Sequence, residues 1–498
     1  MMLLLLLIVL PIILIYVLQK AKKKNIPPGP WPLPLIGNLH QLATASDLHI
    51  YLWKLSEQYG PIMQMKLGST PLLIISSAKL AKEVLKTQDL AFCSRPKSLS
   101  QQKLSYNYLD IIFSPYNEYW REVRKITTIH LFNLKKVKSF RPIREDEISH
   151  FITKISNFAS SHQVVNLSEM AMALSSSLIC RIAFGKKYDE HGSEMRRFDQ
   201  LLHEVQTISI AFYMSDYFPA LSWVDKLTGL INKVDTTCKK LDLFYQELID
   251  EHLDASRVQT MDKEDDILDI LIKLKEEHIS SSFDLTWDHI KALLMNIFIA
   301  GTDTSASAIV WTMTALFKAP NVMKKLQAQI RNLIGEKGKV DEDDLPKLPY
   351  LKAVINETFR LYPVTPLLVP RETMERCVVD GYEIQPKTVV YVSSWAIGRD
   401  PDYWENPNEF IPERFLNSNI DIRGQDFGLF PFGSGRRMCP GMPIGIATVE
   451  LGVANLLYSF DWELPKGIQA EDVDTDSAPG IVVLKKNDLL LLPKKYGV

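Results

Sequence analysis

The stretch from residue 430 to residue 441 reads Phe-Pro-Phe-Gly-Ser-Gly-Arg-Arg-Met-Cys-Pro-Gly. Its closely spaced glycines indicate a backbone that turns tightly or passes close to another group. From Gly441 an apolar pattern of helical period runs to about Ser459. Cys439 is therefore predicted to stand just before a helix N-terminus, where free N–H groups and the helix dipole favour an anion. Arg437, two residues earlier, adds a positive charge.

Both effects lower the pKa of a thiol, and the thiolate is the form that binds a metal. The other cysteines are Cys93, Cys180, Cys238 and Cys377. So few in a chain of 498 residues form no disulfide framework, and without a CxxC pair they do not indicate zinc. We expect these four to be small buried hydrophobic residues. A single thiolate in a glycine-rich loop suits an axial ligand to haem iron.

The pattern Phe432-x-x-Gly435-x-Arg437-x-Cys439-x-Gly441 resembles the haem-binding signature of the cytochrome P450 family, and it matches at every fixed position. The resemblance implies haem b as the cofactor and Cys439 as the axial ligand of its iron. It places Phe432, Arg437 and Gly441 in the cofactor site. A buried cysteine in a glycine loop is the plainer alternative.

A second motif, Glu357-Thr358-Phe359-Arg360, lies on a predicted helix, and the i, i+3 spacing puts Glu357 and Arg360 on one face. Alone this pair would be a common surface ion pair of little energetic value. Together with Arg414 of Pro412-Glu413-Arg414-Phe415 it resembles the family's buried Glu–Arg–Arg cluster. The resemblance implies a structural role, which is to hold the cysteine loop in register.

Trp120 and Arg124 are four residues apart on a predicted helix and therefore share a face. In the family this pair reaches the haem propionates, and an arginine at the position of Arg371 does the same. With Arg437, these arginines would form charge-assisted hydrogen bonds to carboxylates. An ordinary surface basic residue is the alternative for each of them.

The run Ala300-Gly301-Thr302-Asp303-Thr304-Ser305 interrupts an apolar helix predicted from about Ile290 to Phe317. Thr304 can hydrogen-bond back to the carbonyl of Ala300, which bends a helix. The run resembles the oxygen-binding stretch of the family's central helix. Asp303 and Thr304 are accordingly predicted catalytic residues, an acid and an alcohol that relay protons. A generic polar break in a core helix is the alternative.

The N-terminal 19 residues are uncharged and mainly Leu, Ile and Val, close to the roughly 20 residues that a membrane span needs. Lysines follow directly at positions 20, 22, 23 and 24, so this end predicts an uncleaved anchor with the remainder in the cytosol. A cleavable signal would carry its charges first. The expected domains are an anchor at 1–19, a basic and proline-rich hinge at 20–36, and the catalytic domain at 37–498.

The formal net charge of −2 argues against a nucleic-acid binder. Residues 45–375 read mostly as amphipathic helix, with hairpins expected at Gly68-Ser69 and Asp380-Gly381 and a strand at Thr388 to Ser393. The fold class is therefore mainly α with small β-sheets. It forms one large haem-thiolate domain of the cytochrome P450 type, preceded by a transmembrane helix.

The runs Lys86-Thr87-Gln88-Asp89-Leu90 and Gly424 to Gly441 resemble the plant microsomal group of the family. This implies a monooxygenase of the endoplasmic reticulum membrane, single-pass and facing the cytosol. It would insert one oxygen of O2 into a small lipophilic terpenoid, alkaloid, phenolic or oxime. NADPH-cytochrome P450 reductase would supply electrons, with cytochrome b5 as a second candidate donor. A haem-thiolate isomerase or dehydratase that uses no O2, and a non-enzymatic haem sensor, are the alternatives.

The sequence also predicts a surface that docks the redox partner and the walls of a substrate pocket. A basic patch near the thiolate could steer an acidic flavoprotein, and a solvated helix face is its alternative. This patch comprises Arg121, Lys125, Lys135, Lys136, Lys138 and Arg436. Resemblance to the family also places apolar and aromatic substrate-pocket walls, which a plain core would share, at Tyr106, Phe113, Phe212, Ala300, Val364, Leu368 and Ile481.

Overall fold

The computed structural model describes residues 25–43, 45, 47–188, 192–254, 265–277 and 284–497. The predicted anchor at 1–19 and the first hinge residues lie outside these ranges. The helices are α2 (Leu39–Ala43), α3 (Leu48–Tyr59), α4 (Ala78–Lys82), α5 (Asp89–Phe92), α6 (Leu99–Leu104), α7 (Glu118–Ile126), α8 (Leu134–Ser139), α9 (Arg141–Ser160), α10 (Leu167–Phe184), α11 (Ser193–Ile210), α12 (Met214–Tyr217), α13 (Ser222–Leu227), α14 (Leu230–Leu253), α15 (Ile267–Glu276), α16 (Trp287–Lys318), α17 (Pro320–Ile334), α18 (Pro349–Leu361), α19 (Ser394–Ile397) and α20 (Met442–Ser459). The strands are β1 (Ile62–Leu67), β2 (Thr70–Ile75), β3 (Val165–Asn166), β4 (Arg371–Glu372), β5 (Cys377–Val379), β6 (Tyr382–Ile384), β7 (Val389–Val392), β8 (Phe460–Glu463) and β9 (Leu490–Lys495). The mainly helical class with small sheets is confirmed.

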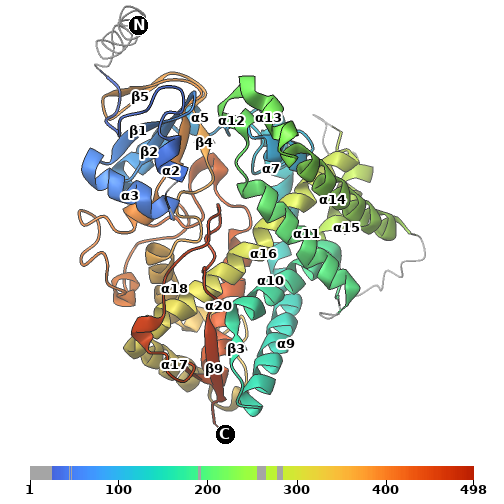
Figure 1. Cartoon of the computed structure of the whole chain (residues 1–498). Helices are drawn as coiled ribbons and strands as arrows, with labels where there is room; N and C mark the ends of the chain where they lie inside the picture. The colour runs from blue at the N-terminus through green and yellow to red at the C-terminus, as the bar shows by residue number, and fades with distance from the viewer. Residues whose placement is uncertain are drawn as a thin grey trace, which may run out of the picture.

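Helix α16 crosses the middle of the molecule, and the other long helices surround it (Figure 1). Its contact with α10 is close, because a Cβ on Gly301 would lie 2.3 Å from Cδ1 of Ile179. The close packing of α10 and α16 therefore explains why glycine stands at position 301 in the middle of a helix. On another side α16 approaches α20, where a Cβ on Gly452 would lie 3.2 Å from Cδ1 of Ile309.

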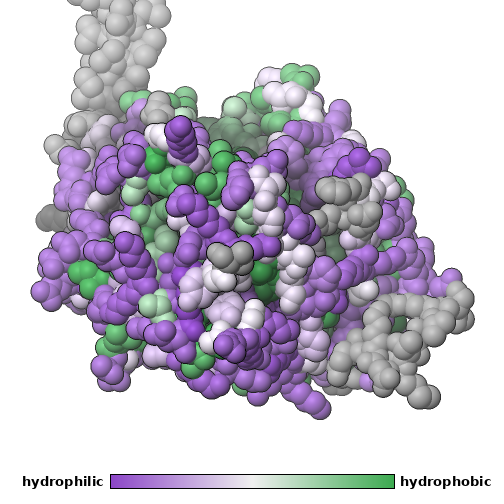
Figure 2. All heavy atoms as spheres, turned by 90° about the horizontal axis from the view of Figure 1, so that it is seen from below, coloured by the Kyte–Doolittle hydropathy of each residue, from purple (hydrophilic) through white to green (hydrophobic). Residues whose placement is uncertain are grey.

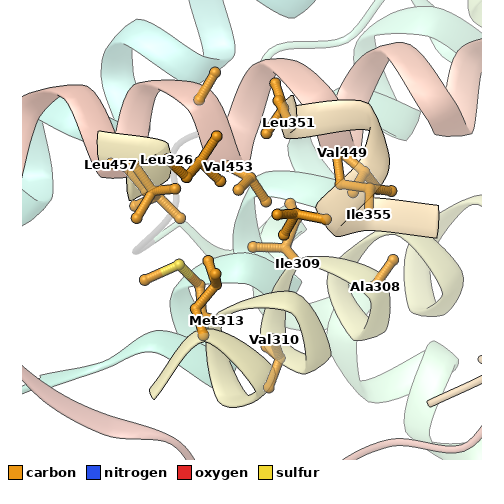
Figure 3. Packing of buried hydrophobic residues seen from close by; sticks show 14 of the residues in the cluster. Ala308, Ile309, Val310, Met313, Leu326, Leu351, Ile355, Val449, Val453 and Leu457 are labelled. Carbon is orange, nitrogen blue, oxygen red and sulfur yellow. The ribbon is translucent and has the colours of Figure 1, made fainter. Parts of the chain in front are cut away.

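Apolar side chains from four helices fill the space between α16 and α20 (Figure 3). Ile309 of α16, Leu326 of α17, Leu351 of α18 and Val453 of α20 are each fully buried. Burying a side chain of this size contributes roughly 1.5–3 kcal/mol. This core fixes α20, and with it the loop that precedes α20 in the chain.

Three small sheets flank the helices in the part of the chain that the structure describes. The first has the order β1-β2-β7-β4, with β2 and β7 parallel and the other pairs antiparallel. Both predicted hairpins are present, β1–β2 across Gly68 and β5–β6 across Gly381, and each of these glycines has a positive φ. The third sheet has the order β3-β9-β8. The described part of the proline-rich segment lies along β1, where Gln64 N–H donates to the Pro28 carbonyl at 2.8 Å.

Three described helices, α10, α16 and α20, are long and apolar enough for a membrane crossing by length and composition alone. Their apolar side chains instead pack together inside the domain, as Gly301 and Gly452 illustrate. The face seen in Figure 2, at the end of the molecule that carries the C-terminus, is dominated by polar side chains with scattered apolar ones.

Candidate functional site

The cysteine loop joins the core to α20. Gly433 and Gly435 have φ of 71° and 70°, so this loop does need residues without a Cβ. Gly441 has φ of −81°, and its nearest neighbour would be the Cys439 sulfur at 3.9 Å from a Cβ. The backbone N–H of Cys439 donates to the Phe432 carbonyl at 2.9 Å, which closes the loop. Phe432 packs edge-on against Phe359 of α18, with ring centroids 5.8 Å apart.

Burial raises the pKa of the Cys439 thiol above its ordinary value. Backbone N–H groups of Gly441 and Met442 and the charge of Arg124 oppose this rise but do not outweigh it. The expectation of a lowered pKa is therefore wrong for the loop by itself, because the loop also removes the sulfur from water. A metal cation on the sulfur would supply the missing stabilisation of the thiolate.

Trp120 of α7 and Arg437 of the cysteine loop stack, with the guanidinium carbon 4.1 Å from the ring centroid. Both also donate to one carbonyl, that of Ile111, at 2.9 and 3.2 Å. Arg124, one turn along α7, donates to the carbonyl of Met438 at 2.6 Å. The structure thus brings Trp120, Arg124 and Arg437 together. From the sequence, Arg437 could be grouped with the other two only by resemblance to the family.

Arg95 is a fourth arginine at this place, and our sequence reasoning missed it. It is buried and donates to carbonyls of Ile112, Val369 and Pro370 at 2.7–2.8 Å. Desolvation and the neighbouring charges of Arg437 and Arg371 lower the pKa of Arg95 well below its ordinary value. The sequence around Arg95 contains no motif that would have predicted a buried arginine beside Arg437 and Arg371.

Within the described residues, Arg95, Arg124 and Arg437 form no salt bridge with a protein carboxylate. Burial also lowers the pKa of Arg437 to about 9. Buried positive charge is costly unless an anion compensates it. A cofactor that carries carboxylates beside a thiolate ligand fits this donor set.

Arg371 differs from the other three because the protein already pairs it. Its guanidinium lies 3.0 Å from the Asp89 carboxylate and donates to the Ser434 carbonyl at 2.8 Å. Asp89 also accepts from the side chain of Arg436 at 2.8 Å. These contacts hold the cysteine loop against α5.

The predicted Glu–Arg–Arg cluster is present and buried. Arg360 lies 2.7 Å from the Glu357 carboxylate with both side chains fully buried, and Arg414 lies 3.1 Å from the same carboxylate. Arg360 also donates to the carbonyls of Pro407 and Glu409, so the cluster ties α18 to the segment ahead of the cysteine loop.

A stripe of partly accessible residues runs along the middle of α16, where most other residues are buried. Ile297, Ala300, Gly301 and Thr304 are each partly accessible, with the i, i+3, i+4, i+7 spacing of a single helix face. Gly301 lies against Ile179 of α10, so the part of this stripe that no neighbouring helix covers is at Ile297, Ala300 and Thr304. The Thr304 hydroxyl donates to the Ala300 carbonyl at 2.7 Å, as predicted.

Asp303 is turned away from this stripe and is 5% exposed. Its two carboxylate oxygens accept from the side-chain amide of Gln206 of α11, at 2.9 and 2.8 Å. Burial raises the pKa of Asp303 to about 6, against the lowering effect of Gln206. Gln206 was not predicted, because nothing in the sequence relates α11 to α16.

The predicted pocket residues separate into two groups. The segments that hold Val364 and Ile481 lie side by side against α16, since Val483 N–H donates to the Val364 carbonyl and Ser307 donates to the Val483 carbonyl. Phe113 and Leu368, like Ala300, are partly buried.

The other two predicted wall residues make contacts with their own neighbours. Phe212 is 50% exposed and its ring stacks on that of Tyr217. The Tyr106 hydroxyl donates to Asp242 of α14 at 2.9 Å, so it is directed toward that helix.

Comparison with known proteins agrees with this geometry. The family model described as Cytochrome P450 matches residues 27–492. This chain belongs to the cytochrome P450 family. As a P450 it is a haem-b-binding monooxygenase that depends on a redox partner, and the buried arginines and the cysteine loop fit that cofactor.

Several curated relatives of this P450 are plant enzymes. The 6,7,8-trihydroxycoumarin synthase of Pastinaca sativa is 50% identical over 493 residues, which cover 97% of this chain and 96% of the relative. The 5-OH-xanthotoxin synthase of Ammi majus is 49% identical over 493 residues, with the same coverage. Among solved structures, a zebra fish cytochrome P450 with progesterone has a TM-score of 0.77 and 25% identity, covering 90% of this chain and 99% of its own.

Proposed function

We propose that this P450 hydroxylates a coumarin-type phenolic of plant specialised metabolism. One observation carries the proposal: two relatives named for hydroxylated coumarin and xanthotoxin products share about half of this sequence over nearly its whole length. A flat, mostly apolar aromatic substrate also suits walls that are mainly apolar, as ligand pockets usually are. Of the four substrate classes expected from the sequence (terpenoid, alkaloid, phenolic and oxime), the proposal retains the phenolic class.

We assign the cofactor contacts to residues that converge in space. Cys439 would bind the haem iron, and Trp120, Arg124, Arg437 and Arg371 would serve the haem carboxylates, with Arg95 as an added donor. Phe432 and Gly441 would line the sulfur side of the site. The haem supplies activation of O2 when it is bound.

The protein's own chemical contribution is to hold and move protons. Burial raises the pKa of Asp303 to about 6, so its carboxyl takes up and releases a proton closer to neutral pH than an ordinary aspartate does. The Thr304 hydroxyl lies on the partly accessible stripe of α16. In this proposal Asp303 and Thr304, on different sides of α16, are the acid and the alcohol of one proton relay that water molecules connect.

The substrate proposal is tested with recombinant enzyme, its reductase and NADPH. The substrates should be coumarins carrying zero, one or two hydroxyl groups, next to one terpenoid and one alkaloid. A coumarin product heavier by one oxygen atom, absent with Cys439→Ser, is the expected result. Oxidation of the terpenoid or alkaloid without any hydroxycoumarin would refute the proposal.

We also propose attachment to the endoplasmic reticulum by residues 1–19, with the catalytic domain in the cytosol. Large apolar side chains are exposed on two neighbouring segments: Trp31, Leu33, Leu35, Phe212, Leu221, Trp223 and Leu227. The β1–β2 turn links the two segments, because Gly68 N–H donates to the Ile36 carbonyl and the Ser69 hydroxyl donates to the Tyr217 carbonyl, each at 3.1 Å. They lie at the opposite end of the molecule from the C-terminus (Figure 1).

This attachment has a direct test. Removing residues 1–24 should leave part of the protein bound to microsomes, and adding Trp223→Ser and Leu227→Ser should release it. Complete release by the truncation alone would contradict a role for the exposed apolar surface.

Electron transfer would use the basic patch, since Arg121 and Lys125 are exposed on α7, the helix whose Arg124 touches Met438 beside the cysteine. Arg436 is also half exposed but pairs with Asp89. We propose this face as the docking site for the reductase, and for cytochrome b5 as a second donor.

A further inference from the structure

The turn from Leu109 to Ser114 is bonded on almost every side. Its carbonyls accept hydrogen bonds from side chains outside the turn: Tyr119 to Leu109, Trp120 and Arg437 to Ile111, Arg95 to Ile112, and Arg437 to Ser114. These donors include Trp120 and Arg437, which the proposed function assigns to the haem carboxylates. The position of this turn therefore sets the position of both.

The N–H side of the turn is held by two buried polar residues. Asn296 of α16 accepts from Ile111 N–H at 2.9 Å and from Ile112 N–H at 3.3 Å. The Asp110 carboxylate accepts from Ile112 and Phe113 N–H at 3.0 and 2.9 Å. The Asn296 amide then donates to the same oxygen of Asp110 at 3.0 Å. This pair is here called the Asp110–Asn296 clamp.

The clamp is costly to bury. Asp110 and Asn296 are 0% and 3% exposed, and Oδ1 of Asp110 accepts no hydrogen bond within the described residues. Desolvation raises the pKa of Asp110, against its hydrogen bonds and the charge of Arg437. A local turn does not require a buried carboxylate, because a neutral acceptor such as a serine or asparagine side chain can accept from turn N–H groups without burying a charge. What the clamp adds is a fixed register between α16 and the turn.

We propose that Asp110 and Asn296 are positioning residues for cofactor binding. They fix the turn that aims Trp120 and Arg437, and they attach it to the helix that carries Asp303. The proposal rests on the proposed function, which places the haem carboxylates at Trp120 and Arg437. Its direct consequence is that the clamp controls how tightly the holoenzyme retains haem.

The test measures haem transfer from the ferric holoenzyme to an excess of apomyoglobin, together with thermal unfolding. Asn296→Leu removes every bond of the clamp that starts on α16. Asn296→Asp keeps both acceptor contacts but sets a carboxylate against Asp110, and it serves if the leucine variant does not fold. Either change should speed haem transfer about tenfold, since an unpaired buried donor or acceptor costs about 1–3 kcal/mol.

The matched control is Asn455→Leu in α20. Asn455 is 4% exposed and makes a similar clamp, donating to the Val340 carbonyl at 3.0 Å and accepting from its N–H at 3.1 Å. The Asn455→Leu variant should lower the unfolding temperature as much as Asn296→Leu does. Its rate of haem transfer should stay within about twofold of the wild-type rate. The proposal would be overturned if Asn296→Leu and Asn455→Leu accelerated haem transfer equally, or if neither variant accelerated it.

A third variant separates this inference from the function on which it rests. Arg437→Gln should speed haem transfer if the carboxylates bind there. If it does so while the Asn296 variants match the control, the clamp proposal alone fails. If Arg437→Gln has no effect, the assignment of the haem carboxylates fails, and the clamp proposal fails with it.

Discussion

Gln206 of α11 donates its side-chain amide to both carboxylate oxygens of Asp303 of α16, at 2.9 and 2.8 Å. This bond holds the acid away from the partly accessible stripe of the helix on which Thr304 lies. A helix outside the cysteine region therefore controls the rotamer and the ionisation of the predicted proton donor.

Gln206→Leu should uncouple the enzyme. Loss of the amide removes stabilisation of the ionised carboxylate, so the pKa of Asp303 rises further and its side chain is freed. We expect about tenfold less product per NADPH consumed, a part of the roughly 10²–10⁴-fold that a positioned acid supplies, because Asp303 itself is retained. The pH at which product formation is half-maximal should also move upward.

The matched control is Gln200→Leu on the same helix. Gln200 donates to Glu204 at 3.1 Å on the exposed side of α11. This variant should keep the wild-type coupling and pH profile. Equal behaviour of the two variants would show that Asp303 is not positioned by Gln206 during turnover.

Asp303→Asn should stabilise the protein while it lowers activity. A carboxyl whose pKa is higher in the folded protein binds more protons when folded, so its contribution to stability falls as pH rises. The pKa of Asp303 changes from 3.8 to about 6, so the loss develops between these values. At pH 7 the variant should gain up to ~3 kcal/mol in the free energy of unfolding.

This gain is measured as the difference in unfolding midpoint between the variant and wild type. The difference should shrink as the pH is lowered toward 4, where both side chains are neutral. A constant difference across the range would contradict the assigned shift in pKa.

Glu357→Gln should destabilise the fold severely. It leaves Arg360 and Arg414 without their common counter-charge, and the pair with Arg360 is fully buried. Breaking a buried ion pair on one side costs roughly 3–5 kcal/mol. Glu463→Gln, which breaks the half-exposed pair with Lys494, is the control and should cost less than about 1 kcal/mol. Chemical unfolding of both variants makes the comparison, and similar small losses would contradict the structural role.

Charge reversal at Arg121 and Lys125 should raise the reductase concentration needed for half-maximal turnover. The effect should be several-fold at low salt and should shrink as salt screens the charges. Lys233→Glu with Lys239→Glu on α14 changes net charge equally, on exposed lysines outside the patch. If both double variants need the same reductase concentration, docking does not use this patch.

Local sequence was enough wherever function depends on residues close together in the chain. The turn conformations of Gly433 and Gly435, the hairpins at Gly68 and Gly381 and the Thr304 hydrogen bond to Ala300 all follow from short-range geometry. The same reasoning was wrong about the pKa of Cys439. It counted the N–H groups and the arginine but not the burial of the sulfur.

The sequence by itself determined the family and the mainly helical class and predicted Cys439 as the ligand, because spacing within one loop or one helix is preserved on folding. Only the tertiary structure decided that Gln206 holds Asp303, that Arg95 joins the buried arginines, and that Asp110 meets Asn296. Asp110 and Asn296 are 186 residues apart. A buried polar group must find a partner wherever the packing of helices supplies one, and no sequence period records which helix that will be.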